Sequence, residues 1–279
     1  MATNSYSNLK SVSSAWNSAL RDFGIVDVMN AKVYNVYDGM TKTEYTALTA
    51  ASTLGTRTLT EVFEDSCGST ATKIDFSTMK VNEIIALYLA TEPVTELKYL
   101  KTANAPQEGP KKTITGGQNA NILLKYGKSA RLEMQNALGN AEALEALGGM
   151  TVEYFRSQLA TAATLKTGAT DVLHATNLFA PERTIIGETF LVDAKSGAQV
   201  DAYIIFYNFL PESLMNLTQD AEGDATVFDM NGDLRVTKVF VGDKEATGDT
   251  DGIVVSDFYA ILPKLDYAAD FDVIVDNGI

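Results

Sequence analysis

The spacing of strand-like segments in the last third of the chain constrains the fold most. Runs rich in Val, Ile, Phe and Tyr alternate there with clusters of Gly, Asp and Asn. β-Branched and aromatic residues favour a pleated, half-buried backbone, and the small polar residues favour turns. The runs are 184–192, 200–209, 226–241, 253–262 and 271–275. Such spacing predicts a mainly-β chain, an antiparallel β-sandwich or barrel.

Further strands are expected upstream, where β-branched residues again recur. They are 31–37, 57–63, 73–76, 113–126 and the alternating segment 130–134. The apolar segment 82–90 is compatible with a helix or a strand, because a short apolar run carries no clear period.

Two segments have helical patterns. Apolar residues recur every three or four positions from Leu9 to Phe23, and Gly24 follows, which predicts a helix over about residues 8–22 in an N-terminal arm, 1–24. The segment NAEALEALGG, 140–149, predicts a short helix ended by its two glycines. The expected architecture is therefore a β-sandwich or barrel with one or two short flanking helices and an N-terminal helix.

The chain is expected to form one main structural domain, 1–279. Its best candidate for a loop or subdomain boundary is KTANAPQEGPKK, 101–112, which combines two prolines, a glycine and three lysines with few apolar residues.

The net charge of −14 is concentrated in one part of the chain. Residues 1–170 contain 16 acidic and 16 basic side chains, whereas residues 171–279 contain 20 acidic and 6 basic ones. Nucleic-acid binding depends on Lys and Arg that neutralise phosphates, so the acidic part is not expected to bind nucleic acid. It is either a solvated acidic face or a surface that must not adhere to an anion.

No signal peptide is apparent in the first twenty residues, and no apolar run approaches the ~20 residues that cross a bilayer. We therefore expect a soluble protein that is made in a cytoplasm and has no membrane partner.

Few residues are candidates for catalysis. Gly127, Lys128 and Ser129 resemble the end of a phosphate-binding loop, but Ile122 occupies the position where that loop needs glycine. Cys67 and His174, the only members of their types, form a conceivable nucleophile and base pair, or else a small buried thiol and a loop histidine.

Two acidic turns are candidates for metal sites. Asp229, Asn231 and Asp233 have the spacing of a calcium loop, but Phe240 stands where the bidentate Glu is needed. Asp249, Asp251 and Gly252 form either a structural turn or a weak cation site. We predict no metal, no cofactor and no catalytic residues.

Paired carboxylates of a glycosidase cannot be recognised among 36 acidic residues. Sugar hydrolases also tend to carry several tryptophans for stacking, and this chain has only Trp16.

Two stretches resemble virion structural proteins of tailed bacteriophages, particularly the tail tube or major tail proteins. The first is TGGQNANILLKYGKSARLEMQNALGNAEALEALGG, 115–149. The second, within 184–236, contains TIIGETFLVDAKSGAQVDAYIIFYNFLP followed by LTQDAEGDATVFDMNGDLRV. The similarity lies in the texture and order of the segments rather than in an invariant motif.

This resemblance implies a non-enzymatic β-protomer that assembles into stacked, hexameric rings forming a virion tail tube. Its implied partners are other copies of itself and further virion proteins such as sheath, terminator or baseplate. The resemblance also implies an acidic lumen through which DNA passes without specific binding. The N-terminal helix and the 101–112 segment have no counterpart in the family pattern.

Two alternatives remain open. The first is another phage component, such as a capsid, decoration or baseplate protein. The second is an acidic β-rich enzyme or ligand-binding protein that uses residues from 220–257.

Overall fold

The computed structural model divides the chain into two compact units. Unit 1 comprises 1–100, 182–208 and 236–279, and unit 2 comprises 101–181 and 209–235. The structure describes residues 15–17, 19, 21, 23–98, 100–108, 111–116, 120–125, 127–136, 141–148, 150–153, 172–175, 180–212, 228–242 and 252–276. A compact unit of contacts is not by itself an independently folding domain, so the expectation of one main domain stays a prediction.

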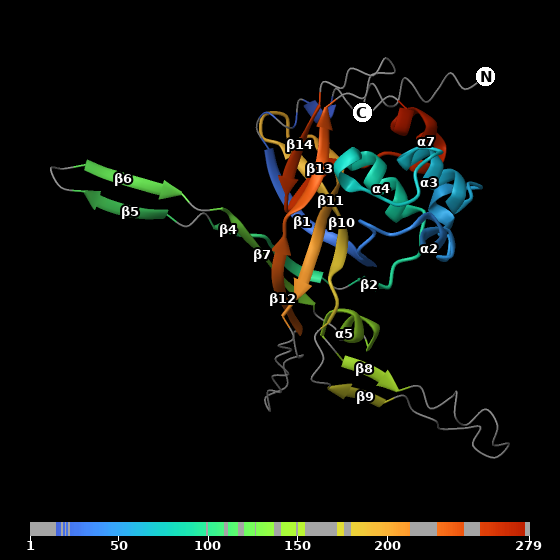
Figure 1. Cartoon of the computed structure of the whole chain (residues 1–279), viewed down its shortest axis with the longest axis horizontal. Helices are drawn as coiled ribbons and strands as arrows, with labels where there is room; N and C mark the ends of the chain where they lie inside the picture. Colours follow the sequence, from blue (N-terminus) through green and yellow to red (C-terminus); the bar gives the residue numbers. More distant parts are fainter. Residues whose placement is uncertain are drawn as a thin grey trace. The chain divides into compact units, whose positions relative to one another are not determined.

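Unit 1 is built on antiparallel strands in the order β2-β1-β10-β11, with β15 also paired to β11 (Figure 1). A separate two-stranded sheet, β13-β14, belongs to the same unit. The strands are β1 (Phe23–Asn35), β2 (Thr95–Leu97), β10 (Arg183–Asp193), β11 (Gln199–Pro211), β13 (Thr237–Gly242), β14 (Gly252–Asp257) and β15 (Tyr259–Pro263). The last three residues of β11 are counted with unit 2.

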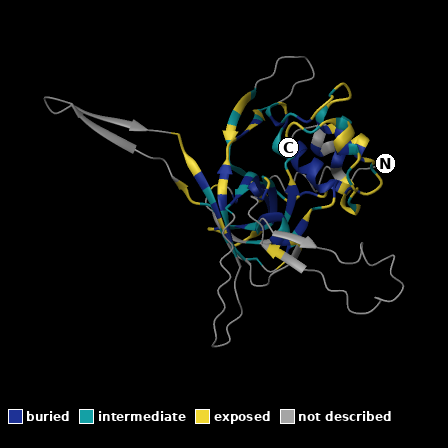
Figure 2. Ribbon diagram, turned by 60° about the horizontal axis from the view of Figure 1, so that its bottom comes forward, coloured by how far each residue is buried: buried dark blue, intermediate teal, exposed yellow. Residues whose placement is uncertain are grey.

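Four helices of unit 1 pack together (Figure 1). They are α2 (Lys42–Thr46), α3 (Leu59–Cys67), α4 (Val81–Leu89) and α7 (Tyr267–Asp276), joined by the 3-10 turns η1 (Ser52–Leu54) and η2 (Phe76–Thr78). Their apolar side chains form one core with Ile186 of β10 and with Tyr203, Ile205 and Tyr207 of β11. Because these three β11 residues alternate along the strand, the helices cover one face of it. Figure 2 shows the buried residues gathered where helices and strands meet.

Unit 2 is also mainly antiparallel β. Its strands β12, β7 and β3 are neighbours in that order, and β4 also pairs with β7. Two further two-stranded sheets, β5-β6 and β8-β9, pair only within themselves among the described strands. The elements are β3 (Leu100–Asn104), β4 (Gln107–Glu108), β5 (Lys111–Gly116), β6 (Ala120–Lys125), β7 (Ser129–Asn136), α5 (Ala141–Gly148), β8 (Met150–Glu153), β9 (Val172–Ala175) and β12 (Phe228–Arg235).

The expected fold class is confirmed, since the chain is mainly β with antiparallel pairing and short helices. The predicted strands at 31–37, 130–134, 184–192 and 200–209 correspond to β1, β7, β10 and β11, and the described part of 113–126 corresponds to β5 and β6. The segment 253–262 divides into two strands, β14 and β15, and the described part of 226–241 divides into β12 and β13. The helix of 140–149 is α5.

Three strand predictions were wrong. Segment 57–63 lies largely in α3, which begins with a capping box between Thr58 and Glu61. Segment 73–76 contains only an isolated bridge at Lys73 and the start of η2. Segment 271–275 lies in α7, where Tyr267, Phe271 and Ile274 are buried at helical spacing.

Three further segments have the following structures. The ambiguous segment 82–90 forms α4, which is buried on almost every side. The segment 101–112, expected as a loop or a subdomain boundary, contains β3, β4 and the first residues of β5 in its described part, and unit 1 ends directly before it, at Leu100. Of the predicted helix 8–22, the described residues 15–17 and 19 are helical, and Trp16 and Ala19 pack against Leu191 and Ala202. The rest of that segment lies outside the described residues.

Candidate functional site

Strands β13 and β14 form a two-stranded sheet that we call the apolar ribbon. The strands pair antiparallel from Thr237 opposite Asp257 to Gly242 opposite Gly252. No other strand in the described part of unit 1 joins this sheet. A two-stranded sheet is only marginally stable in water on its own, so its stability depends on what it packs against.

One end of the apolar ribbon is anchored in unit 1. Thr237 and Val239 are buried, and Asn208 Nδ2 donates a 2.8 Å hydrogen bond to Thr237 Oγ1. The backbone N–H of Phe240 donates to the carbonyl of Met79 at 3.1 Å. These contacts anchor the ribbon to the rest of unit 1.

The far end exposes large aliphatic side chains. Val241 is 47% exposed, Ile253, directly opposite it, is 67% exposed, and the adjacent Val254 is 53% exposed. Val241 and Ile253 share one face of the ribbon, whereas Val254 points to the opposite face, because successive side chains of a strand alternate. Exposed large apolar side chains can mark a contact site, and strands with unpaired edges are ready to pair with another chain. A hollow of about 220 Å³ borders the same end and is lined in part by Val241, Phe240 and Pro263. The arrangement can bind an apolar or strand-like partner.

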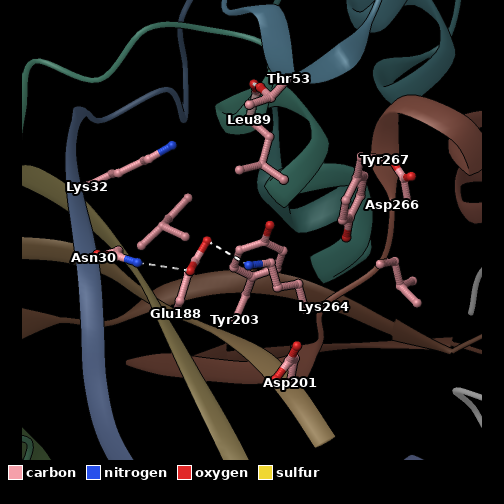
Figure 3. A pocket seen from close by; sticks show the side chains of 12 residues that line it. Asn30, Lys32, Thr53, Leu89, Glu188, Asp201, Tyr203, Lys264, Asp266 and Tyr267 are labelled. Carbon is pink, nitrogen blue, oxygen red and sulfur yellow. Dashed lines mark hydrogen bonds and ion pairs between the residues drawn. The ribbon is translucent and has the colours of Figure 1, made fainter.

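A second feature of unit 1 is a cavity of about 420 Å³, which we call the Glu188 pocket (Figure 3). Its lining side chains come from β1, η1, α4, β10, β11, the segment before α7 and the first residue of α7. Its lining residues are Asn30, Lys32, Thr53, Leu89, Ile186, Glu188, Asp201, Tyr203, Lys264, Leu265, Asp266 and Tyr267.

Glu188 is held at the centre of this pocket by two donors. Lys264 Nζ lies 2.9 Å from Glu188 Oε1, and Asn30 Nδ2 donates to Glu188 Oε2 at 3.2 Å. Burial by itself would raise the pKa of Glu188, but the hydrogen bonds from Lys264 and Asn30 outweigh it, and the pKa lies below its usual value. Glu188 is therefore ionised at neutral pH.

An irregular stretch of β1 brings Asn30 to the pocket. The pairing of β1 with β10 shifts register on both sides of Met29, and Asn30 adopts a φ of 47°. Asparagine tolerates this left-handed conformation better than most residues, and β-bulges redirect side chains next to binding sites.

Two tyrosines complete the pocket. Lys264 Nζ lies 5.6 Å from the centre of the Tyr203 ring. Burial, together with the charges of Glu188 and Asp266, raises the pKa of Tyr203 to about 12. Tyr267 is 3% exposed, its pKa is raised by burial, and its hydroxyl has no hydrogen-bond partner among the described residues. Both phenols are therefore protonated at neutral pH and available as donors.

The candidate pair from the sequence is divided between the units. Cys67 closes α3 in unit 1, where its Sγ lies 3.8 Å from Met79 Sδ. His174 lies in unit 2, exposed on β9 opposite Thr151. The structure describes no arrangement that brings the two side chains together.

The other candidates lie in extended backbone or outside the described residues. Asp229, Asn231 and Asp233 belong to β12, where they face Gln135, Glu133 and Arg131 of β7. Gly127 and Lys128 are exposed and lead into β7 at Ser129. Asp249 and Asp251 lie outside the described residues, and Gly252 begins β14, where the Phe240 ring leaves no room for a Cβ. No group of three or more potential metal ligands occurs within the described ranges.

Neither the exposed end of the apolar ribbon nor the Glu188 pocket was among the sites expected from the sequence. A weak signal for the pocket was present, since Glu188 is the only charged residue in the strand segment TIIGETFLV. Nothing in the sequence indicated that Lys264, 76 positions later, would pair with it.

No protein-family model matches the chain, and no curated protein matches it. Among the described helices, none combines the length and the apolar character needed to cross a membrane.

Proposed function

We propose that this chain is a non-enzymatic structural protein of a tailed-phage virion, which self-assembles into the stacked hexameric rings of a tail tube. The observation that carries the proposal is the exposed aliphatic end of the apolar ribbon, at Val241, Ile253 and Val254. Burying such side chains against another copy is worth about 25 cal/mol per Å² of apolar surface. Edge-strand pairing in a closed ring would add backbone hydrogen bonds.

Two further observations support the proposal. The antiparallel, mainly-β architecture is the one that the resemblance to tail tube proteins implies. The net charge of −14 arises within 171–279, and an acidic lumen would repel DNA and let it pass without adhering.

The self-contained sheets β5-β6 and β8-β9 of unit 2 fit the same role. Each is a two-stranded sheet without a further described strand, and such sheets gain stability when another surface covers them. Contacts between copies, or with other virion proteins such as sheath, terminator or baseplate, would supply that cover.

Electron microscopy of the purified protein tests the proposal. We expect rings or tubes at high protein concentration, more readily at elevated salt, because salt screens the repulsion between acidic copies. Monomers alone under these conditions would contradict it. Immunolabelling of virions separates tube from head, since label on heads would favour a capsid or decoration protein.

A further inference from the structure

The Glu188 pocket contains a buried donor that nothing in the described structure satisfies. A buried polar group left without a hydrogen bond costs about 1–3 kcal/mol, so native structures rarely leave one unmatched without reason. The Tyr267 hydroxyl is such a group, and it lies on the wall of a cavity large enough for a small ligand. Figure 3 shows the Tyr267 hydroxyl directed toward the part of the pocket that holds Tyr203 and Lys264.

The groups around this hydroxyl offer both donors and acceptors. The Tyr203 and Tyr267 hydroxyls and the Lys32 ammonium can donate hydrogen bonds to a ligand (Figure 3). Asp201 and Asp266, both exposed, can only accept. Asp266 Oδ1 already accepts from the backbone N–H groups of Ala268 and Ala269, so a ligand would bind its Oδ2. Glu188 is already bound by Lys264 and Asn30.

The charges restrict the ligand further. Glu188 and Lys264 form a neutral ion pair. The other charged residues of the lining are one cation, Lys32, and two carboxylates, Asp201 and Asp266, so the lining has a net negative charge. An anion would be repelled by this excess of negative charge. An ammonium ion would have no lone pair to accept the Tyr267 proton, and it would lose hydration beside Leu89 and Ile186.

We propose that the Glu188 pocket binds a neutral polyhydroxylated ligand of the size of a small saccharide. A hydroxyl group donates and accepts at once, so one such ligand can accept from Tyr267 and Tyr203 and donate to Asp201 and Asp266. It brings no net charge into the pocket, and its carbon skeleton lies against Leu89 and Ile186. This binding role is independent of self-assembly.

Saturation-transfer NMR on the full chain tests the proposal. The probes are glucose, galactose and N-acetylglucosamine, with glucuronate, glucosamine and leucine as anionic, cationic and zwitterionic comparisons. We expect saturation of at least one neutral sugar, and weaker binding of the charged probes. No signal from any neutral sugar, or tighter binding of any charged probe, would overturn the proposal.

Two tyrosine variants locate the site. Tyr267→Phe removes the hydroxyl in the pocket and should weaken sugar binding about tenfold, as expected for a hydrogen bond in a binding site. Tyr207→Phe is the matched control, because Tyr207 is also buried with an unpartnered hydroxyl but does not line the pocket. Equal affinities of the two variants would overturn the proposal.

A substitution at an exposed residue tests the site without changing the buried core. Asp201→Ala alters an exposed acceptor of the pocket, whereas Asp233→Ala alters an exposed carboxylate of β12 in unit 2. Sugar binding should weaken severalfold in the first variant only. Unchanged binding in Asp201→Ala would contradict the assigned ligand class.

Discussion

At the scale of single residues, Tyr88 connects the helical layer of unit 1 to its strands. Its ring stacks on that of Tyr37 with 4.3 Å between centroids. Its hydroxyl accepts a hydrogen bond from the Tyr37 backbone N–H at 3.2 Å and shares another with Thr184 Oγ1 at 2.9 Å. Tyr207, by contrast, is equally buried but has no partner for its hydroxyl among the described residues.

These two tyrosines give a matched pair of substitutions. Tyr88→Phe should lower the free energy of unfolding by about 1–3 kcal/mol, because it leaves a buried N–H and a buried hydroxyl without their partner. Tyr207→Phe should change it by less than about 0.5 kcal/mol, or raise it slightly, because no hydrogen bond is lost. Urea unfolding measures both, and equal effects would contradict the hydrogen-bond assignment at Tyr88.

At the scale of elements, helix α3 shows how local chemistry determines a structure that apolar periodicity alone did not reveal. Thr58 Oγ1 accepts from the N–H of Glu61 at 3.3 Å, and the Glu61 carboxylate accepts from the N–H of Thr58 at 2.7 Å. The carboxylate also accepts from the Thr58 hydroxyl at 2.8 Å, and the bonds that it accepts from the Thr58 N–H and hydroxyl lower the pKa of Glu61. The start of α3 is therefore fixed by two reciprocal bonds.

Removing this cap should destabilise unit 1. Thr58→Ala is expected to cost about 1 kcal/mol of unfolding free energy, the usual value for a lost N-cap. Thr60→Ala, at an exposed position within the same helix, serves as the control and should have little effect. A loss in Thr60→Ala as large as that in Thr58→Ala would show that the cap does not account for the stability of α3.

The same helix illustrates what the sequence could and could not predict. Strands such as β10 and β11 were predictable because Ile, Val, Tyr and Phe recur through segments of 11 and 13 residues. The segments of α3 and α7 contain similar residue types but form helices. A capping box favours the helix in α3, and the helical spacing of the buried residues favours it in α7. The Glu188 pocket was not predictable, since its groups come from segments that only tertiary pairing brings together.

At the scale of the whole molecule, burial of tyrosine makes stability dependent on alkaline pH. Burial raises the pKa of Tyr37 to about 12, and it also raises the pKa values of Tyr34, Tyr45, Tyr88 and Tyr207. In the unfolded chain these phenols titrate near pH 10. The folded state therefore holds protons that the unfolded state releases, and stability falls as the pH rises above about 10.

Urea unfolding between pH 8 and about pH 11.5 measures this dependence. The unfolding midpoint should be nearly constant up to about pH 10 and then decline, with tyrosinate absorbance appearing only as the chain unfolds. Ionisation of all 12 tyrosines near pH 10 with native circular dichroism would contradict the described burial.

The central claim is that the exposed end of the apolar ribbon holds copies of the chain together. Sedimentation velocity of wild type, Ile253→Asp and Val94→Asp at high protein concentration tests it most directly. Val94 is an exposed apolar residue of unit 1 outside the ribbon, at 40% exposure, and so controls for added charge on an exposed apolar position. The account predicts large assemblies for wild type and Val94→Asp and small species for Ile253→Asp. Assemblies of Ile253→Asp that match those of wild type, or a monomeric wild type, would contradict it.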